Sequence, residues 1–175
     1  MNSFKTEKWI PFEFYFKSSD KYDGNVLFKC EVDVKFTSQS KKEIIVPAFW
    51  TGENNWCIRF SPDEIGKWTF ETLCEKDVSL NGIKGELECT EYTGDLEIYK
   101  RGFLKTEKGI PYFMYQDGTP FFYLGDTHWS MAEEEFDSAG DRAGDIKTDS
   151  RFKYLVDRIV DNKFTVYQSN IVHLI

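Results

Sequence analysis

An aspartate and a histidine stand one residue apart, at Asp126 and His128, directly after a run of apolar and aromatic residues. The run, Pro120–Leu124, is short and ends at Gly125, which is typical of a strand buried on both faces of a parallel sheet. Polar side chains at the carboxyl end of such a strand open onto the crevice where α/β folds bind ligands. The sequence therefore predicts a candidate site at this strand end, with the adjacent Trp129 as part of it.

Two kinds of chemistry are open to this pair. Alternate residues of a strand share a face, so Asp126 and His128 could act as an acid and a base, or they could bind a metal ion. A protein metal site needs further ligands, and no third one accompanies the pair, so we expect no metal ion here. In the simpler alternative, the Asp126 carboxylate accepts hydrogen bonds from backbone N–H groups at the turn after the strand. The other histidine, His173, is expected to be incidental.

Four aspartates then recur at every fourth position, at residues 137, 141, 145 and 149. On a helix this spacing would stack like charges on one face, which disfavours a helix. The spacing also fails the pattern of a calcium-binding loop. We therefore expect residues 130–149 to form a solvated acidic loop, with a cation site as the alternative.

A helix and a strand are predicted after this loop. Asp149 or Ser150 can cap the helix, and apolar residues at the spacing of one helical face continue up to Asn162. Residues 164–175 are rich in β-branched and aromatic side chains, as strands are. Strand, helix and strand make one βαβ unit with parallel strands. A (β/α)8 barrel needs roughly 250 residues, so we expect the first βαβ unit of an incomplete barrel, with a small α/β cap as the alternative.

The first part of the chain shows a different pattern, in which short strands alternate with turns. The strands are expected at residues 9–17, 26–37, 43–51, 55–60, 67–74 and 82–92. This regular spacing is typical of an immunoglobulin-like β-sandwich, so the predicted fold class is mainly β. We divide the chain into a sandwich domain, residues 1–98, and a segment of residues 99–175 that holds a connector, a hairpin and the truncated barrel.

Two local sequence features predict specific structures, a hairpin turn and a set of core tryptophans. Asp117 and Gly118 lie between two apolar runs, which is a strong signal for a hairpin turn. Trp50, Trp56 and Trp68 are expected to pack the core between the two sheets. Trp68 shares a strand face with Phe70, and Trp56 shares one with Ile58 and Phe60. Stacking of these tryptophans on sugars at the surface is the alternative.

Composition and sequence pattern argue against several classes of binding partner and cellular location. The net charge of −8 argues against nucleic acid and anionic membrane surfaces as partners. No apolar run is long enough to span a membrane, and the N-terminus lacks the pattern of a secretory signal, so we expect a cytoplasmic protein. The four cysteines have no metal-ligand spacing and are expected to be buried free thiols, with disulfides as the alternative.

The segments YDGN, FWTGENNWCIRFSPDEIGKWTF and RGFLKTEKGIPYFMYQDGTPFFYLGDTHW resemble those of bacterial glycoside hydrolases of the apiosidase-like family. In that family a β-sandwich domain of unassigned function precedes a (β/α)8 catalytic barrel. The resemblance implies substrate-side roles for Asp126, His128, Trp129 and Gln168: hydrogen bonds to sugar hydroxyls from the polar groups and an apolar face from the indole. The two catalytic carboxylates of glycosidases would lie on later strands, so the resemblance assigns no catalytic residue here, and it implies no cofactor.

Our leading hypothesis is that the chain is the N-terminal portion of a glycoside hydrolase acting on O-glycosidic bonds of complex carbohydrates, and is inactive by itself. A non-catalytic carbohydrate-binding module is the second hypothesis. The third is a structural or interaction protein that recruits another chain, or a second copy of itself, through an open sheet edge.

Overall fold

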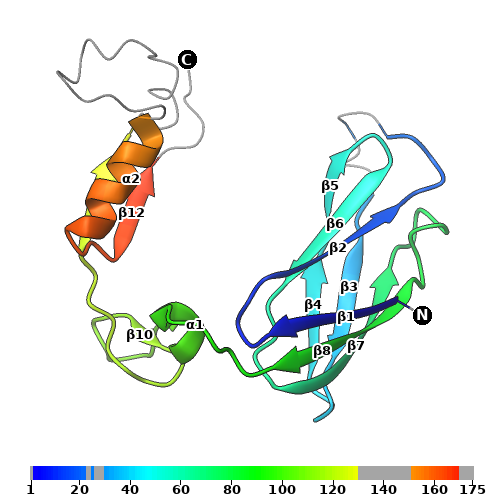
Figure 1. The fold of residues 1–175 in the computed structure, drawn as a ribbon. Coiled ribbons are helices and arrows are strands. Elements are labelled where there is room, and N and C mark those ends of the chain that lie inside the picture. Colours follow the sequence, from blue (N-terminus) through cyan, green and yellow to red (C-terminus); the bar gives the residue numbers. More distant parts are fainter. Residues whose placement is uncertain (1, 23–24, 26–29, 130–150, 170–175) are drawn as a thin grey trace. The chain divides into compact units, whose positions relative to one another are not determined.

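The computed structural model describes residues 2–22, 25, 30–129 and 151–169 (Figure 1). These residues form a mainly β structure. The chain divides into two compact units, which we call unit 1 (Met1–Lys105 with Tyr115–Thr119) and unit 2 (Thr106–Met114 with Pro120–Ile175). No helix among the described residues has the length and apolar character needed to cross a lipid bilayer.

Unit 1 contains two sheets. The larger sheet has the strand order β1-β8-β7-β3-β4 and is antiparallel except that β1 runs parallel to β8. Its strands are β1 (Asn2–Glu7), β3 (Asp33–Thr37), β4 (Glu43–Pro47), β7 (Gly66–Leu73) and β8 (Lys84–Thr90). The smaller sheet is antiparallel with the order β2-β6-β5, and its strands are β2 (Phe12–Lys17), β5 (Phe49–Gly52) and β6 (Asn55–Phe60).

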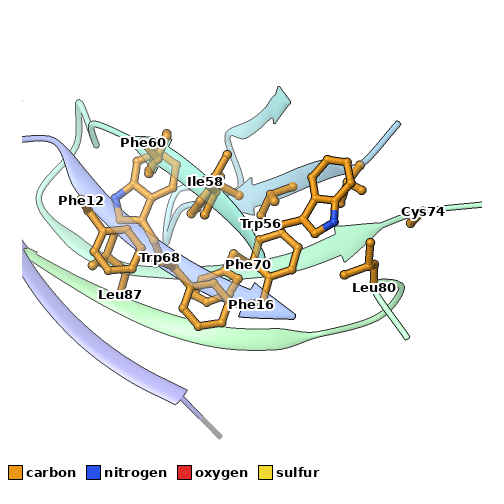
Figure 2. Packing of buried hydrophobic residues seen from close by; sticks show 14 of the residues in the cluster. Phe12, Phe16, Trp56, Ile58, Phe60, Trp68, Phe70, Cys74, Leu80 and Leu87 are labelled. Atoms are coloured by element: carbon orange, nitrogen blue, oxygen red, sulfur yellow. The ribbon is translucent and has the colours of Figure 1, made fainter. Parts of the chain in front are cut away.

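The core of unit 1 lies between these two sheets, and Figure 2 shows side chains from both meeting there. Alternation along a strand can deliver every second side chain to this core, as β2 does with Phe12, Phe14 and Phe16. Across the interface, the rings of Phe36 on β3 and Phe60 on β6 stack with centroids 3.9 Å apart. The predicted pattern of alternating apolar and polar residues therefore buries one face of β2, β3, β7 and β8.

The tryptophans and cysteines follow the expectation. Trp56 and Trp68 are 2% and 0% exposed, so they pack the core and cannot stack on a sugar at the surface. Trp50 is half-buried and packs against the same cluster. All four cysteines, at positions 30, 57, 74 and 89, are free and buried, which confirms the prediction of free thiols.

Two strand predictions in unit 1 need correction. Strand β1 was not predicted because all its residues except Phe4 are polar and none is fully buried. It is a strand because it pairs in parallel with β8, which no local pattern reveals. The stretch predicted as one strand, 43–51, is two strands in different sheets. It breaks at Ala48, after Pro47, which has no backbone N–H to continue a ladder.

A connector and a hairpin turn follow the two sheets along the chain. A short helix, α1 (Glu97–Arg101), precedes β9 (Leu104–Lys105) and β10 (Met114–Tyr115). The predicted hairpin turn is present: Tyr115 N–H donates to the Thr119 carbonyl at 2.8 Å, and Gly118 takes a φ of 89°. Glycine fits this position because other residues rarely adopt such a φ.

Unit 2 contains β11 (Gly125–His128), helix α2 (Arg151–Asp161) and β12 (Val166–Ser169). β11 and β12 pair in parallel, as predicted for a βαβ unit. The strand expected over the apolar run 120–124 is placed wrongly, because β11 begins only at Gly125. The acidic stretch with its aspartates at 137, 141, 145 and 149, and also His173, lie outside the described residues.

Candidate functional site

The candidate site is built on the parallel pair β11–β12. In its register Asp126 lies opposite Tyr167, Thr127 opposite Gln168, and His128 opposite Ser169. Successive side chains of a strand point to opposite faces, and paired residues of neighbouring strands point to the same face. One face of the pair therefore carries Asp126 and His128, as the sequence predicted.

The register also assigns the residues of β12 to faces. Tyr167 and Ser169 share the face of Asp126 and His128, whereas Gln168 shares the opposite face with Thr127. Sequence reasoning missed Tyr167 and Ser169, although a parallel pairing of known register would have selected them. Both are half-buried, and the phenolic oxygen of Tyr167 is buried.

Asp126 occupies a position within a strand, because β11 begins at Gly125. Asp126 and His128 are themselves strand residues of β11, not loop residues beyond a strand, and only Trp129 follows the last strand residue. Asp126 is exposed, His128 is half-buried, and the indole of Trp129 is 69% exposed. Such a solvent-facing indole beside polar side chains can pack its apolar face on a sugar ring.

The Asp126 carboxylate has one local hydrogen bond. Its Oδ1 atom accepts from the backbone N–H of Thr127 at 2.9 Å. The alternative in which Asp126 bonds backbone N–H groups is thus realised within β11, not at the turn after it. Because this bond uses one carboxylate oxygen, it is compatible with a ligand at the other oxygen.

Hydrogen bonds of Thr165 connect the segments that lead into β11 and β12. Its hydroxyl donates to the carbonyl of Phe122 at 2.6 Å and accepts from the backbone N–H of Leu124 at 2.9 Å. The backbone N–H of Thr165 also donates to the Leu124 carbonyl at 2.9 Å. These bonds join the residue before β12 to the residues before β11, so they set the register that aligns the site.

An aromatic hollow of about 460 Å³ lies on the residues that precede β11. It is lined by Pro111, Tyr112, Phe113, Phe121, Phe122 and Tyr123. The rings of Phe113 and Tyr123 stack with centroids 5.8 Å apart, and Phe121 N–H donates to the Phe113 carbonyl at 2.8 Å. The sequence predicted a doubly buried strand here, but Phe122 and Tyr123 are 73% and 52% exposed.

Within the described ranges, no three His, Cys, Asp or Glu side chains come together as ligands for a metal ion. The β11–β12 face therefore carries carboxylate, imidazole, phenol and hydroxyl groups that can form hydrogen bonds with a ligand, and one exposed indole lies next to them in the chain. Polyhydroxylated ligands with an apolar face match such a set of groups.

Comparison with known proteins gives two family matches and one solved structure. Residues 5–75 match a domain of unknown function, DUF5060, and residues 107–174 match the family described as "Apiosidase-like, catalytic domain". A solved structure described as a "putative glycoside hydrolase" from Bacteroides vulgatus ATCC 8482 is 26% identical, with a TM-score of 0.59. The match covers 79% of this chain and 26% of that chain, so this chain spans about a quarter of the length of that protein. No curated protein matches.

The strand pair that carries Asp126 and His128 lies inside the second matched segment, and the packed sheets of unit 1 contain the first. The resemblance indicated by the sequence is confirmed for residues 107–174, which match the apiosidase-like catalytic domain family and follow a segment that matches DUF5060.

Proposed function

We propose that this chain is the front part of a glycoside hydrolase that cleaves O-glycosidic bonds of complex carbohydrates. In this proposal unit 1 is an immunoglobulin-like β-sandwich, and β11, α2 and β12 are the first βαβ unit of a (β/α)8 barrel. The observation that carries the proposal is the parallel β11–β12 register, which aligns Asp126 and His128 on one face inside the segment matched to the catalytic domain. The four free thiols are compatible with the cytoplasmic location that the sequence suggested.

The proposed role of the site is to hold the sugar, not to break the bond. Asp126 would accept hydrogen bonds from sugar hydroxyls, His128 would donate or accept one, and Trp129 would cover the apolar face of the ring. Gln168, whose register places it on the other face, would reach the sugar only around the end of β12. The two carboxylates required for hydrolysis would come from elsewhere in the enzyme.

The first test is hydrolysis. The purified chain, incubated with a panel of aryl glycosides and plant oligosaccharides, is expected to release no sugar. Turnover that survives repurification and disappears in Asp126→Asn would contradict the proposal, because it would place a catalytic carboxylate within this chain.

The second test is binding at the candidate site. Trp129 is the one tryptophan of residues 106–175, so its indole N–H resonance reports on unit 2 during titration with monosaccharides. We expect this resonance to shift with sugar, and the shift to be lost in Asp126→Asn and in His128→Ala. Comparison of Gln168→Ala with Tyr167→Phe then tests which face of β12 the sugar contacts. If only the tryptophans of unit 1 respond, the carbohydrate-binding-module hypothesis replaces this one.

A further inference from the structure

Two of the four buried thiols face each other in unit 1. The Sγ atoms of Cys30 and Cys74 lie 3.6 Å apart, although the residues are 44 positions apart in the sequence. The other two cysteines have different surroundings, since Cys57 and Cys89 each point a thiol at the carbonyl of the next residue. The Cys30–Cys74 pair is therefore a distinct feature of the core.

The pairing of β3 with β7 brings these two cysteines together. Asp33, the first residue of β3, lies opposite Leu73, the last residue of β7. Cys74 follows Leu73 directly, and Cys30 stands three residues before Asp33. The backbone N–H of Cys74 donates to the Asn81 side chain at 2.9 Å, which holds the Cys74 backbone in place at the end of the strand.

The geometry points to a reversible disulfide between these residues: we propose that Cys30 and Cys74 form an intramolecular bridge when the folded chain meets a small-molecule disulfide oxidant. A disulfide has an S–S bond of about 2.0 Å, so the two sulfur atoms must approach by about 1.6 Å. Side-chain rotation at two residues can supply such a movement.

Solvent access favours Cys74 as the residue that reacts first. Cys74 is 7% exposed and forms part of the wall of a surface hollow of about 780 Å³, whereas Cys30 is 5% exposed and is not among the described residues that line this hollow. Burial also raises the pKa of the Cys30 thiol, which disfavours its reactive thiolate form.

The reaction is two thiol–disulfide exchanges. The Cys74 thiolate attacks one sulfur of the reagent RSSR, which forms a mixed disulfide and expels RS⁻. The Cys30 thiolate then attacks Cys74 Sγ, which forms the Cys30–Cys74 bond and expels the second RS⁻. The protein loses two protons and two electrons, and one RSSR is reduced to two RSH.

The charge around the hollow predicts which oxidants react fastest. Three carboxylate residues, Glu31, Asp33 and Glu75, line the hollow together with Lys76. This excess of negative charge repels anionic reagents and attracts cationic ones. We therefore expect cystamine, a cationic disulfide, to react faster than anionic oxidised glutathione, and added salt to reduce the difference.

The experiment treats the folded chain with cystamine, removes the reagent, blocks remaining thiols with an alkylating agent and maps peptides without reduction. The expected result is one cross-linked peptide pair containing Cys30 and Cys74, with Cys57 and Cys89 alkylated after unfolding. Because the bridge closes a loop of more than 40 residues, the Tm of the oxidised protein should rise by roughly 5–15 °C, and a reductant should reverse the rise.

Two variants make the result specific. Cys74→Ala should abolish the bridge and the Tm increase, while the matched core variant Cys89→Ala should keep both. A cross-link to Cys57 or Cys89 would overturn the proposal. So would a lasting mixed disulfide at Cys74 with Cys30 still free, or four thiols that remain unreacted in the folded chain. The peptide map of the unsubstituted chain decides these outcomes even if a variant folds poorly.

Discussion

At the scale of single residues, Asp77 is a buried carboxylate that accepts several hydrogen bonds. It is 5% exposed, and its carboxylate accepts hydrogen bonds from the hydroxyls of Ser18, Tyr22 and Ser79 and from the Ser79 backbone N–H. Burial alone would raise the pKa of Asp77, but these hydrogen bonds outweigh burial and lower the pKa to about 2. Asp77 thereby joins the end of β2 to the turn after β7.

This arrangement makes the stability of unit 1 depend on pH. Because the Asp77 pKa is lower in the folded chain than its ordinary value of 3.8, the ionised carboxylate stabilises the fold fully above about pH 4 and progressively less as the pH falls toward 2. We expect the free energy of unfolding to decrease by about 2 kcal/mol between pH 5 and pH 2 through this group. Urea unfolding at a series of pH values measures the effect.

Asp77→Asn should lower the stability at pH 7 and remove this part of the pH dependence. Glu75→Gln, which changes an exposed carboxylate in the same turn, should leave the pH dependence unchanged. An unaltered acid transition in Asp77→Asn would assign the pH dependence to other carboxylates.

At the scale of elements, the two sheets of unit 1 are held together by aromatic side chains that cross between them. Phe36 of β3 is fully buried and stacks on Phe60 of β6, and Phe60 also meets Trp68 of β7 edge-on at 5.2 Å. Each of these contacts joins one sheet to the other. Large aromatic rings therefore make a major contribution to the packing of the two sheets.

Phe36→Ala should therefore destabilise unit 1 by about 3–5 kcal/mol, because it removes a buried ring and leaves a cavity between the sheets. Chemical denaturation followed by tryptophan fluorescence measures this change. Ile45→Thr on the neighbouring strand β4 is the matched control: Ile45 is 58% exposed, so its substitution should change the stability by about 0.5 kcal/mol or less. Equal losses in the two variants would show that Phe36 makes no special contribution.

At the scale of the whole molecule, unit 1 has its own core, and unit 2 presents large apolar side chains to solvent. Phe122, Tyr123 and Trp129 are 73%, 52% and 69% exposed. Exposed apolar surfaces and open sheet edges promote association between chains. We therefore propose that the chain self-associates through unit 2.

A chain that ends at Thr119 keeps all of unit 1 and should retain its cooperative unfolding transition, monitored by the buried Trp56 and Trp68. It should also sediment as a monomer over a concentration range in which the full chain forms larger species. Loss of the cooperative transition would mean that unit 1 depends on residues 120–175 for its fold. A full chain that stays monomeric at every concentration would contradict the proposed association.

The sequence by itself determined which side chains of unit 1 face the core. Alternation along β3 and β7 assigned Phe36 and Trp68 to the interior, and both are fully buried. It also determined the Asp117–Gly118 turn, the position of helix α2 and the resemblance to apiosidase-like glycoside hydrolases. These features depend on residues that are neighbours in the chain, where the period of a strand, a helix or a turn leaves a direct signal.

Only the tertiary structure decided features that depend on pairing between distant segments. The polar segment of β1 is a strand because β8 lies beside it, and the register with β12 puts Tyr167, not Gln168, on the face of Asp126. The approach of Cys30 to Cys74 follows from the β3–β7 ladder in the same way. A one-residue slip of register reverses every face of a strand, so these placements require the partner strand to be known.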